Sequence, residues 1–319
     1  MVGIASNARH NIVGLLAKTR KGTSIMEIAL HLGAHLTDDN QLRKCLQTNA
    51  DMLRAEGIIV PPARQYLDLI KDAANHISSG AAAPDAFHHI CEAIDTPEDA
   101  KRLVFSGPSL LSRLPDVLDG VQLYPKAARR IDALRKIFTG HQVEIFFAIR
   151  NPASFIPAFL SSQRAQQKGL EASQISAEDL RWSTVLQQIK RAWPEAKLTV
   201  WCDEDTPFLW HQLLRQISGH TPETEFEGSF DWFDTVMVAG AAEKLAQYFN
   251  DAPPVDEDHR QNVIAAFLDK FCDDQKLEID LTTTDWDEAQ VDILTEIYEQ
   301  DVESLSSMPG LHLLQPVEI

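Results

Sequence analysis

The chain has 319 residues, of which 44% are hydrophobic and 24% charged, and it carries a net charge of −18. No apolar run approaches the roughly 20 residues of a membrane-spanning helix, and a chain this acidic repels nucleic acid and anionic membranes. The four cysteines form no C-x-x-C pair, which is typical of a reducing compartment. We therefore expect a cytoplasmic protein without nucleic-acid or membrane partners.

The charge is unevenly distributed along the chain. Residues 251–319 contain 18 acidic and three basic side chains, so the first 250 residues carry a balance of only −3. Acidic runs are usually solvated helix faces, and the alternative is a docking surface for a protein partner. Residues 1–24 contain basic but no acidic side chains, and their apolar stretch is too short for a secretory signal. We expect them to be a flexible extension, or to precede a natural start at Met26.

The segment from Ile25 to Gly57 has the pattern of a strand, a glycine turn and a helix. Ile28-Ala29-Leu30 predicts a short buried strand, and the turn at 33–37 leads into a helix that begins at Asp38-Asp39-Asn40. Apolar residues then recur at helical spacing as far as Leu53. A helix that starts after a glycine turn favours phosphate binding, because unpaired backbone N–H groups and the helix dipole converge there.

Three more apolar runs predict buried strands at 102–105, 143–149 and 198–202. The run VEIFFAI at 143–149 is nearly continuous, as expected of a central strand with both faces covered. Helical patterns span 66–78, 85–94, 125–138, 180–193, about 208–217, 235–249, 260–272 and 287–305. The final helix is expected to end in Leu311-His312-Leu313-Leu314, packed on the core. This alternation predicts one α/β domain at 25–319, a three-layer sandwich with a central parallel sheet and an acidic helical part at 251–319.

Several stretches resemble the sulfotransferase family, particularly its bacterial members. The family begins with a strand and loop of the form H-I-G-x-x-K-T-[GA]-[TS]-[TS], and here HLGAHLTDDN at 31–40 lies on that loop. The family's helix pattern L-x-x-N-x-x-x-L-x-x-x-G continues in step at Leu46, Asn49, Leu53 and Gly57.

Further blocks of the family follow in the same order. A strand that ends in R-[ND]-P resembles Ile149-Arg150-Asn151-Pro152, where we expect Asn151 to cap the next helix with Pro152 at its first position. The acidic turn at 203–205 and the last helix, with Tyr298, are also similar to the family. The resemblance covers about residues 26–319.

The resemblance implies a P-loop NTPase-like fold and transfer of a sulfonate from 3′-phosphoadenosine 5′-phosphosulfate (PAPS) to an alcohol or amine. In the family the first loop holds the 5′-phosphosulfate, its lysine stabilises the bridging oxygen, and the arginine of the second block with a serine holds the 3′-phosphate. Carried over to this chain, the cofactor-binding residues are Gly33, Ala34, Thr37, Asn40, Arg150 and Ser154. The acceptor is expected to be a small molecule or a glycan.

The chemistry of the loop departs from the family. Leu36 stands at the lysine position, and Asp38 and Asp39 occupy the next small and hydroxyl positions. The serine position of the second block is Ala158, which leaves nearby serines, Ser154 among them, to substitute. A carboxylate about 5 Å from a phosphate oxygen costs roughly 3 kcal/mol at an effective dielectric of about 20. The missing lysine removes a transition-state interaction as well.

The sequence therefore favours a sulfotransferase-like protein with a degenerate PAPS site, acting as a binding or regulatory module or through altered chemistry. In that case no cofactor is expected, and the candidate catalytic residues are His35, Asp38 and Asp39. The alternative is an active PAPS-dependent sulfotransferase that uses Arg150 and the loop amides.

Two other interpretations concern the same loop. Imidazole and carboxylate groups are competent metal ligands, so His31, His35, Asp38 and Asp39 would be the ligands of a metal-dependent enzyme, although their spacing matches no familiar metal motif. Alternatively, Asp38 caps the helix and forms a capping box with Gln41, so that the protein supplies its own anion at the helix N-terminus.

Overall fold

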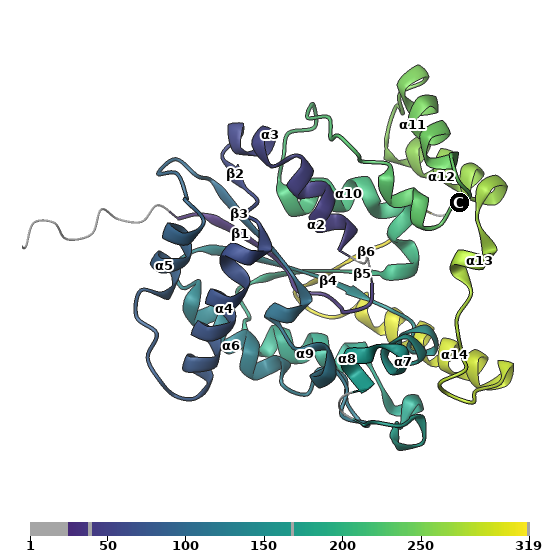
Figure 1. Cartoon of the computed structure of the whole chain (residues 1–319), viewed down its shortest axis with the longest axis horizontal. Helices are drawn as coiled ribbons and strands as arrows, with labels where there is room; N and C mark the ends of the chain where they lie inside the picture. Colours follow the sequence, from purple (N-terminus) through teal and green to yellow (C-terminus); the bar gives the residue numbers. More distant parts are fainter. Residues whose placement is uncertain (1–24, 38–39, 167–168, 318–319) are drawn as a thin grey trace, which may run out of the picture.

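The computed structural model describes residues 25–37, 40–166 and 169–317. The predicted extension at 1–24 lies outside these residues. The described chain forms a six-stranded parallel sheet with the order β2-β3-β1-β4-β5-β6 (Figure 1). The strands are β1 (Glu27–His31), β2 (Ile58–Ile59), β3 (Arg102–Ser106), β4 (Gln142–Ile149), β5 (Lys197–Cys202) and β6 (Leu311–Leu314). The predicted α/β fold with a central parallel sheet is confirmed.

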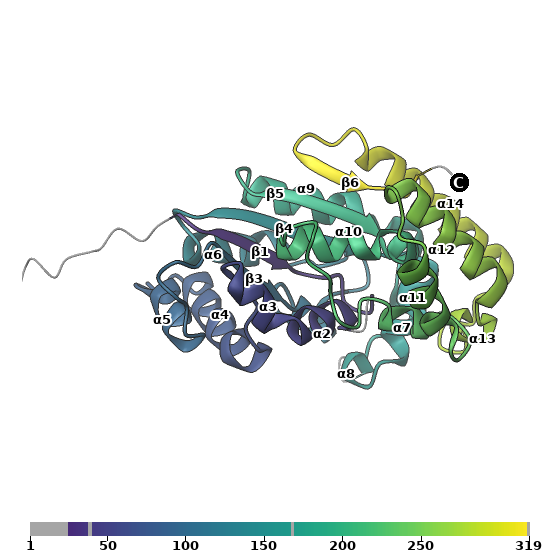
Figure 2. The same ribbon diagram turned by 90° about the horizontal axis from the view of Figure 1, so that it is seen from above.

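Helices cover both faces of the sheet, which gives three layers (Figures 1 and 2). One face carries α2 (Gln41–Thr48), α3 (Ala50–Ala55), α10 (Thr206–Ser218), α11 (Ala241–Asp251) and α12 (Glu257–Phe271). The other face carries α4 (Ala63–Ser78), α5 (Ala86–Ala93), α6 (Ala127–Ile137), α7 (Pro152–Ser161), α9 (Trp182–Ala192) and α14 (Glu288–Leu305). Two short helices, α8 (Gln163–Gln166) and α13 (Asp274–Leu277), follow α7 and α12. None of the described helices is long and apolar enough to cross a membrane.

The two helical layers explain why the strands are apolar at almost every position. In β4, Ile145 and Phe147 pack into the core under α4, α6 and α9, whereas Phe146 and Ala148 pack into the core under α2 and α10. Successive side chains of a strand point to opposite faces, so a strand buried on both faces needs a continuous apolar run. The sequence VEIFFAI supplies it.

The connection that follows β1 and the connections that follow the next strands lie on opposite faces of the sheet. The chain passes from β1 to β2 through α2 and α3 on one face, but from β2 to β3, β4 and β5 through helices on the other face. The loops after β1 and β4 therefore start from adjacent strands and diverge. In parallel α/β sheets such a point, at the carboxyl ends of the strands, is where ligand clefts form.

The four strands predicted from apolar runs are confirmed as β1, β3, β4 and β5. The expectation that the last apolar segment ends a helix is wrong. Leu311–Leu314 is strand β6, which pairs in parallel with β5 at the edge of the sheet. Of its four residues only Leu314 is fully buried, and His312 is exposed. Pairing with β5, which is distant in sequence, therefore determines the conformation of this segment.

The structure also tests three predicted helix starts. Helix α11 begins at Ala241 rather than near 235, because 231–235 is a 3-10 turn and Met237 forms an antiparallel bridge with Cys272. Helix α2 has Asn40 at its N-cap, with a left-handed φ of 66° and no side-chain cap. The cap is thus the last residue of the predicted start at 38–40, and Asp38 and Asp39, with the predicted capping box, lie outside the described residues. The predicted cap of α7 is confirmed, since the Asn151 side chain accepts from the Ala153 N–H.

Candidate functional site

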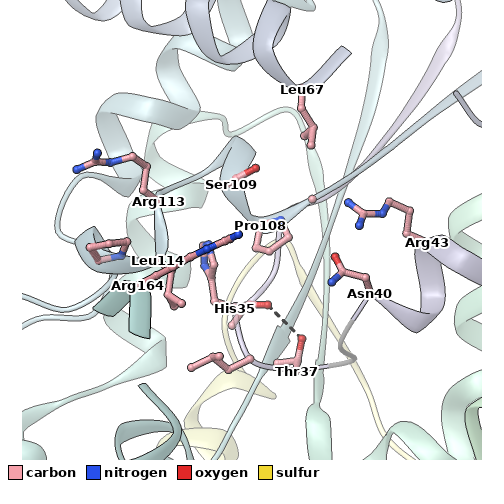
Figure 3. A pocket seen from close by; sticks show the side chains of 14 residues that line it. His35, Thr37, Asn40, Arg43, Leu67, Pro108, Ser109, Arg113, Leu114 and Arg164 are labelled. Atoms are coloured by element: carbon pink, nitrogen blue, oxygen red, sulfur yellow. Dashed lines mark hydrogen bonds between the residues drawn. The ribbon is translucent and has the colours of Figure 1, made fainter. Parts of the chain in front are cut away.

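A cavity of about 730 Å³ opens at the carboxyl edge of the sheet, between the segments that follow β1 and β3 (Figure 3). Its walls come from the loop after β1, from α2 and α4, from the turn at 107–115 and from α8. Pockets that hold small organic ligands have volumes of about 300–1,000 Å³. The position and the volume both fit a ligand site.

Three arginines give this cavity a positive lining, and we call it the arginine cavity. Arg43 of α2 and Arg164 of α8 extend into it from opposite sides (Figure 3) and have no ion pair or hydrogen bond to any residue the structure describes. Arg113 points away from the centre and pairs with Asp116, with 2.8 Å between Nε and Oδ2. No described Asp or Glu lines the cavity, which is notable in a chain of net charge −18.

The loop after β1 uses its first amides to extend the sheet. The Leu32 N–H donates to the Phe146 carbonyl at 3.0 Å, and the Ala34 N–H donates to the Ala148 carbonyl at 2.9 Å. The Gly33 carbonyl accepts from the Ala148 N–H at 2.6 Å. A phosphate cradle needs several unpaired N–H groups that converge on one point. In this loop, two of the amides that would build it are bound to β4.

His35 is locked into the wall of the arginine cavity. Its backbone N–H donates to the Tyr124 hydroxyl at 2.8 Å, and its Nδ1 lies 2.8 Å from the same hydroxyl. The phenol therefore donates to Nδ1, which places the imidazole proton on Nε2, and this fits its backbone hydrogen bond to Ser112. Burial lowers the pKa of His35 to about 4, against the opposing effect of that hydrogen bond. The side chain is neutral at physiological pH and joins the loop after β1 to Tyr124 and Ser112.

Arg150 and Ser154, both predicted from the resemblance, contact one another. Arg150 Nε donates to Ser154 Oγ at 2.9 Å, and Arg150 Nη1 donates to the Leu36 carbonyl. Ser154 Oγ in turn donates to the Asn151 carbonyl at 3.0 Å. The guanidinium thus satisfies carbonyl and hydroxyl acceptors of the protein itself.

A second cavity of about 390 Å³, which we call the Arg150 cavity, lies beside these residues. Asp203 and Glu204 line it, and Glu204 accepts from the Asn151 N–H at 2.8 Å and from the Tyr298 hydroxyl at 3.1 Å. Arg150 and Lys276 also line it, but both already donate to backbone carbonyls, Lys276 to those of Asp234 and Met237. With two carboxylates in its lining, the Arg150 cavity is therefore a poorer site for an anion than the arginine cavity.

The structure brings most of the predicted cofactor-binding residues to these two cavities. Ala34 and Asn40 line the arginine cavity, Arg150 and Ser154 line the Arg150 cavity, and Thr37 lines both. Gly33, in the loop after β1, is buried and has a φ of 130°. Asp38 and Asp39 lie outside the described residues, so only His35 of the predicted catalytic residues is placed.

The histidines proposed as metal ligands lie apart. His31 Nδ1 lies 2.9 Å from Ser106 Oγ, and its ring packs on Trp201 in the core under α10. His35 faces Tyr124 in the core on the opposite face of the sheet. Within residues 25–37, 40–166 and 169–317, no group of three or more His, Cys, Asp or Glu side chains is placed to hold a metal ion.

The sequence does not single out the three arginines of the cavity. They are far apart in the chain, and none belongs to a motif. The available signal is the turn Ser106-Gly107-Pro108-Ser109, which follows a buried strand at the edge where ligand clefts form. Ser109 lines the arginine cavity.

Comparisons with known proteins do not assign this chain to a family, so a function must be argued from its residues. No protein-family model matches the chain, and no match is found among curated proteins or solved structures.

Proposed function

We propose that this protein is a sulfotransferase-like binding module that holds an anionic ligand in the arginine cavity. The observation that carries the proposal is the pair of guanidinium groups of Arg43 and Arg164, which extend into one cavity without a hydrogen bond or ion pair to a described residue. Guanidinium groups donate to phosphate and sulfate in a planar, bidentate geometry. An oxyanion between them offsets their mutual repulsion and gains charge-assisted hydrogen bonds.

The loop after β1 argues against sulfonate transfer by the family's mechanism. Leu36 provides no cation for the leaving group, and its carbonyl instead accepts from Arg150. The amides of Leu32 and Ala34 are bound to β4. Transition-state stabilisation by positioned donors is typically worth a few kcal/mol per donor, and these groups do not supply it here. In this proposal the protein binds or senses its ligand, and PAPS is not its cofactor.

An active PAPS-dependent sulfotransferase is the second candidate, and one observation favours it. Thr37 lines both cavities. A donor nucleotide beside Arg150 and Ser154 and an acceptor, small molecule or glycan, in the arginine cavity would therefore meet at this residue. The two carboxylates of the Arg150 cavity weigh against a donor with three anionic groups.

Thermal shift assays at low salt separate the two candidates. The ligands are inorganic sulfate and 3′-phosphoadenosine 5′-phosphate, and the variants are Arg43→Gln/Arg164→Gln and Arg150→Ala. The control is Arg135→Gln, an exposed arginine of α6 paired with Glu195 at 3.1 Å. A ligand at 100 times its Kd stabilises the native state by about 2.7 kcal/mol. We expect sulfate to raise the Tm of the wild type and the control but not of the double variant.

Two results would count against the proposal. Equal stabilisation of the double variant by sulfate would place the anion elsewhere. A saturable rise in Tm with 3′-phosphoadenosine 5′-phosphate that disappears in Arg150→Ala, together with sulfonate transfer from PAPS, would establish the second candidate instead.

A further inference from the structure

The arginine cavity has an apolar wall beside its charged groups. Leu67 of α4, Pro108, Leu114 and Pro115 of the turn after β3, and Leu36 of the loop after β1 all line it. Each of these five residues is half-buried, so part of each apolar side chain remains in contact with the cavity. A site for a bare inorganic anion has no use for such a wall.

We propose that the ligand is an amphiphilic anion, a phosphate or sulfate ester with an apolar body. Its oxyanion lies between Arg43 and Arg164, and its apolar body lies on Leu67 and Leu114. The inference rests on the proposed anion binding in this cavity and adds the chemical class of the ligand. Sites that combine a few convergent polar groups with apolar walls are typical of small organic ligands.

The wall is held in place before a ligand arrives. Leu67 packs so closely on the backbone of Gly107 that a Cβ there would lie 3.1 Å from Leu67 Cδ2. The neighbouring Tyr66 fixes the same turn of α4, because its hydroxyl donates to the Ser106 carbonyl at 2.8 Å and accepts from the Ser106 N–H at 3.0 Å. A rigid wall loses little entropy on binding, so burial of apolar area on it contributes directly to affinity.

A further cavity of about 650 Å³ adjoins the arginine cavity and shares Ser109 and Arg113 with it. Its lining has five basic and three acidic side chains: Lys71, Arg113, Lys126, Arg129 and Arg130 against Asp68, Asp72 and Asp116. Most of the basic groups already have partners, since Lys71 pairs with Asp68, Arg113 pairs with Asp116, and Arg129 and Arg130 donate to backbone carbonyls. A second phosphate or sulfate group in this space would have to displace these contacts, whereas an apolar body on Leu67 and Leu114 would not. A polyanion is therefore the alternative class of ligand.

Titration calorimetry with three phosphate esters of equal charge tests the proposal. The ligands are methyl, phenyl and 2-naphthyl phosphate, and phenyl sulfate in parallel distinguishes a phosphate head from a sulfate head. We expect the Kd to fall by about tenfold from methyl to phenyl phosphate and further with naphthyl, as apolar area is buried. In Leu67→Asn this gain disappears while the affinity for methyl phosphate is kept. Leu69→Asn is the matched control, since Leu69 is an exposed leucine of the same helix that does not line the cavity.

The possible failures are distinguishable. If Leu67→Asn does not fold, Leu114→Ser removes part of the wall from a different segment. Equal affinity for all three esters, still lost in Arg43→Gln/Arg164→Gln, would overturn the amphiphilic ligand and leave anion binding intact. Tighter binding of tripolyphosphate that depends on Lys126 would also overturn it, in favour of a polyanion. Binding that does not depend on Arg43 and Arg164 would overturn the proposed function itself.

Discussion

Arg43 and Arg164 provide, from α2 and α8, the positive charge that a leucine at position 36 cannot provide from the loop after β1. Arg113 is the third arginine of the cavity, but its ion pair with Asp116 already satisfies part of its guanidinium. Arg43 and Arg164 have no hydrogen bond or ion pair to a described residue, so their removal should cost the most affinity. Loss of one charged hydrogen-bonding partner typically costs about 1.5–3 kcal/mol.

Removing the two loop carboxylates should strengthen anion binding. Asp38 and Asp39 stand between Thr37 and Asn40, both of which line the arginine cavity. We expect Asp38→Asn/Asp39→Asn to lower the Kd for sulfate by about tenfold, because the substitutions remove two negative charges that lie between two cavity-lining residues in the sequence. Isothermal titration measures the change. Asp292→Asn/Glu299→Gln, on the exposed surface of α14, changes the net charge equally and should have little effect; an equal gain there would assign the effect to net charge.

The buried neutral His35 should make the protein sensitive to acid. Its pKa of about 4 in the folded state lies below the usual 6.5, so between these values the unfolded chain binds more protons than the folded chain. The stability from this group is complete above pH 6.5 and is lost as the pH falls toward 4, by about 3 kcal/mol in total. We expect urea unfolding to show this slope in the wild type and a smaller slope in His35→Gln. His88→Gln, which changes an exposed histidine of α5, is the control and should keep the wild-type slope. A wild-type slope in His35→Gln as well would contradict the prediction.

At the scale of the elements, the sheet was the most predictable part of the molecule. Four strands could be predicted because they are short apolar runs between polar turns: β1, β3, β4 and β5. A strand that is covered by helices on both faces needs such a run. β6 was not predictable because its four residues become a strand only beside β5, more than a hundred residues earlier in the chain. The start of α11 was misplaced because the bridge between Met237 and Cys272 interrupts a helical pattern.

The amino edge of the sheet is joined by a network around Arg102 of β3. Its guanidinium donates to Glu27 of β1 at 2.7 Å and to Glu144 of β4 at 2.6 Å. It also donates to the Ile217 and Gln216 carbonyls at the end of α10. The network therefore joins three adjacent strands to one helix at the edge opposite the two cavities.

Arg102→Met should destabilise the fold without changing the site. Breaking a buried ion pair costs about 3–5 kcal/mol when a charge is left alone, but Glu144 keeps Lys197 at 2.8 Å, so we expect about 2 kcal/mol in urea unfolding. Lys197→Met is the comparison, since this exposed pair is worth less than about 1 kcal/mol. The Kd for sulfate should be unchanged in both variants. A weaker sulfate affinity in Arg102→Met would show that the two edges are coupled.

At the scale of the whole molecule, acidic residues gather in the C-terminal part of the chain, whereas arginines gather in one cavity. Of the net −18, most lies in residues 251–319, while the arginine cavity has no described carboxylate in its lining. The negative charge of the chain could be read from the sequence, but the positive cavity could not. It is assembled from residues 43, 113 and 164, which only the packing of α2, α4, α8 and the turn after β3 brings together. The loop was predictable as a site in position, though not in the groups that would bind a ligand.

The most direct test of the central claim is to locate a bound oxyanion in crystals. Selenate replaces sulfate with the same charge and shape, and its selenium is located by anomalous scattering. We predict the main anomalous peak between the guanidinium groups of Arg43 and Arg164, and its loss in crystals of Arg43→Gln/Arg164→Gln. A peak beside Arg150 and Ser154, unaffected by the double variant, would contradict the claim that the arginine cavity is the anion site.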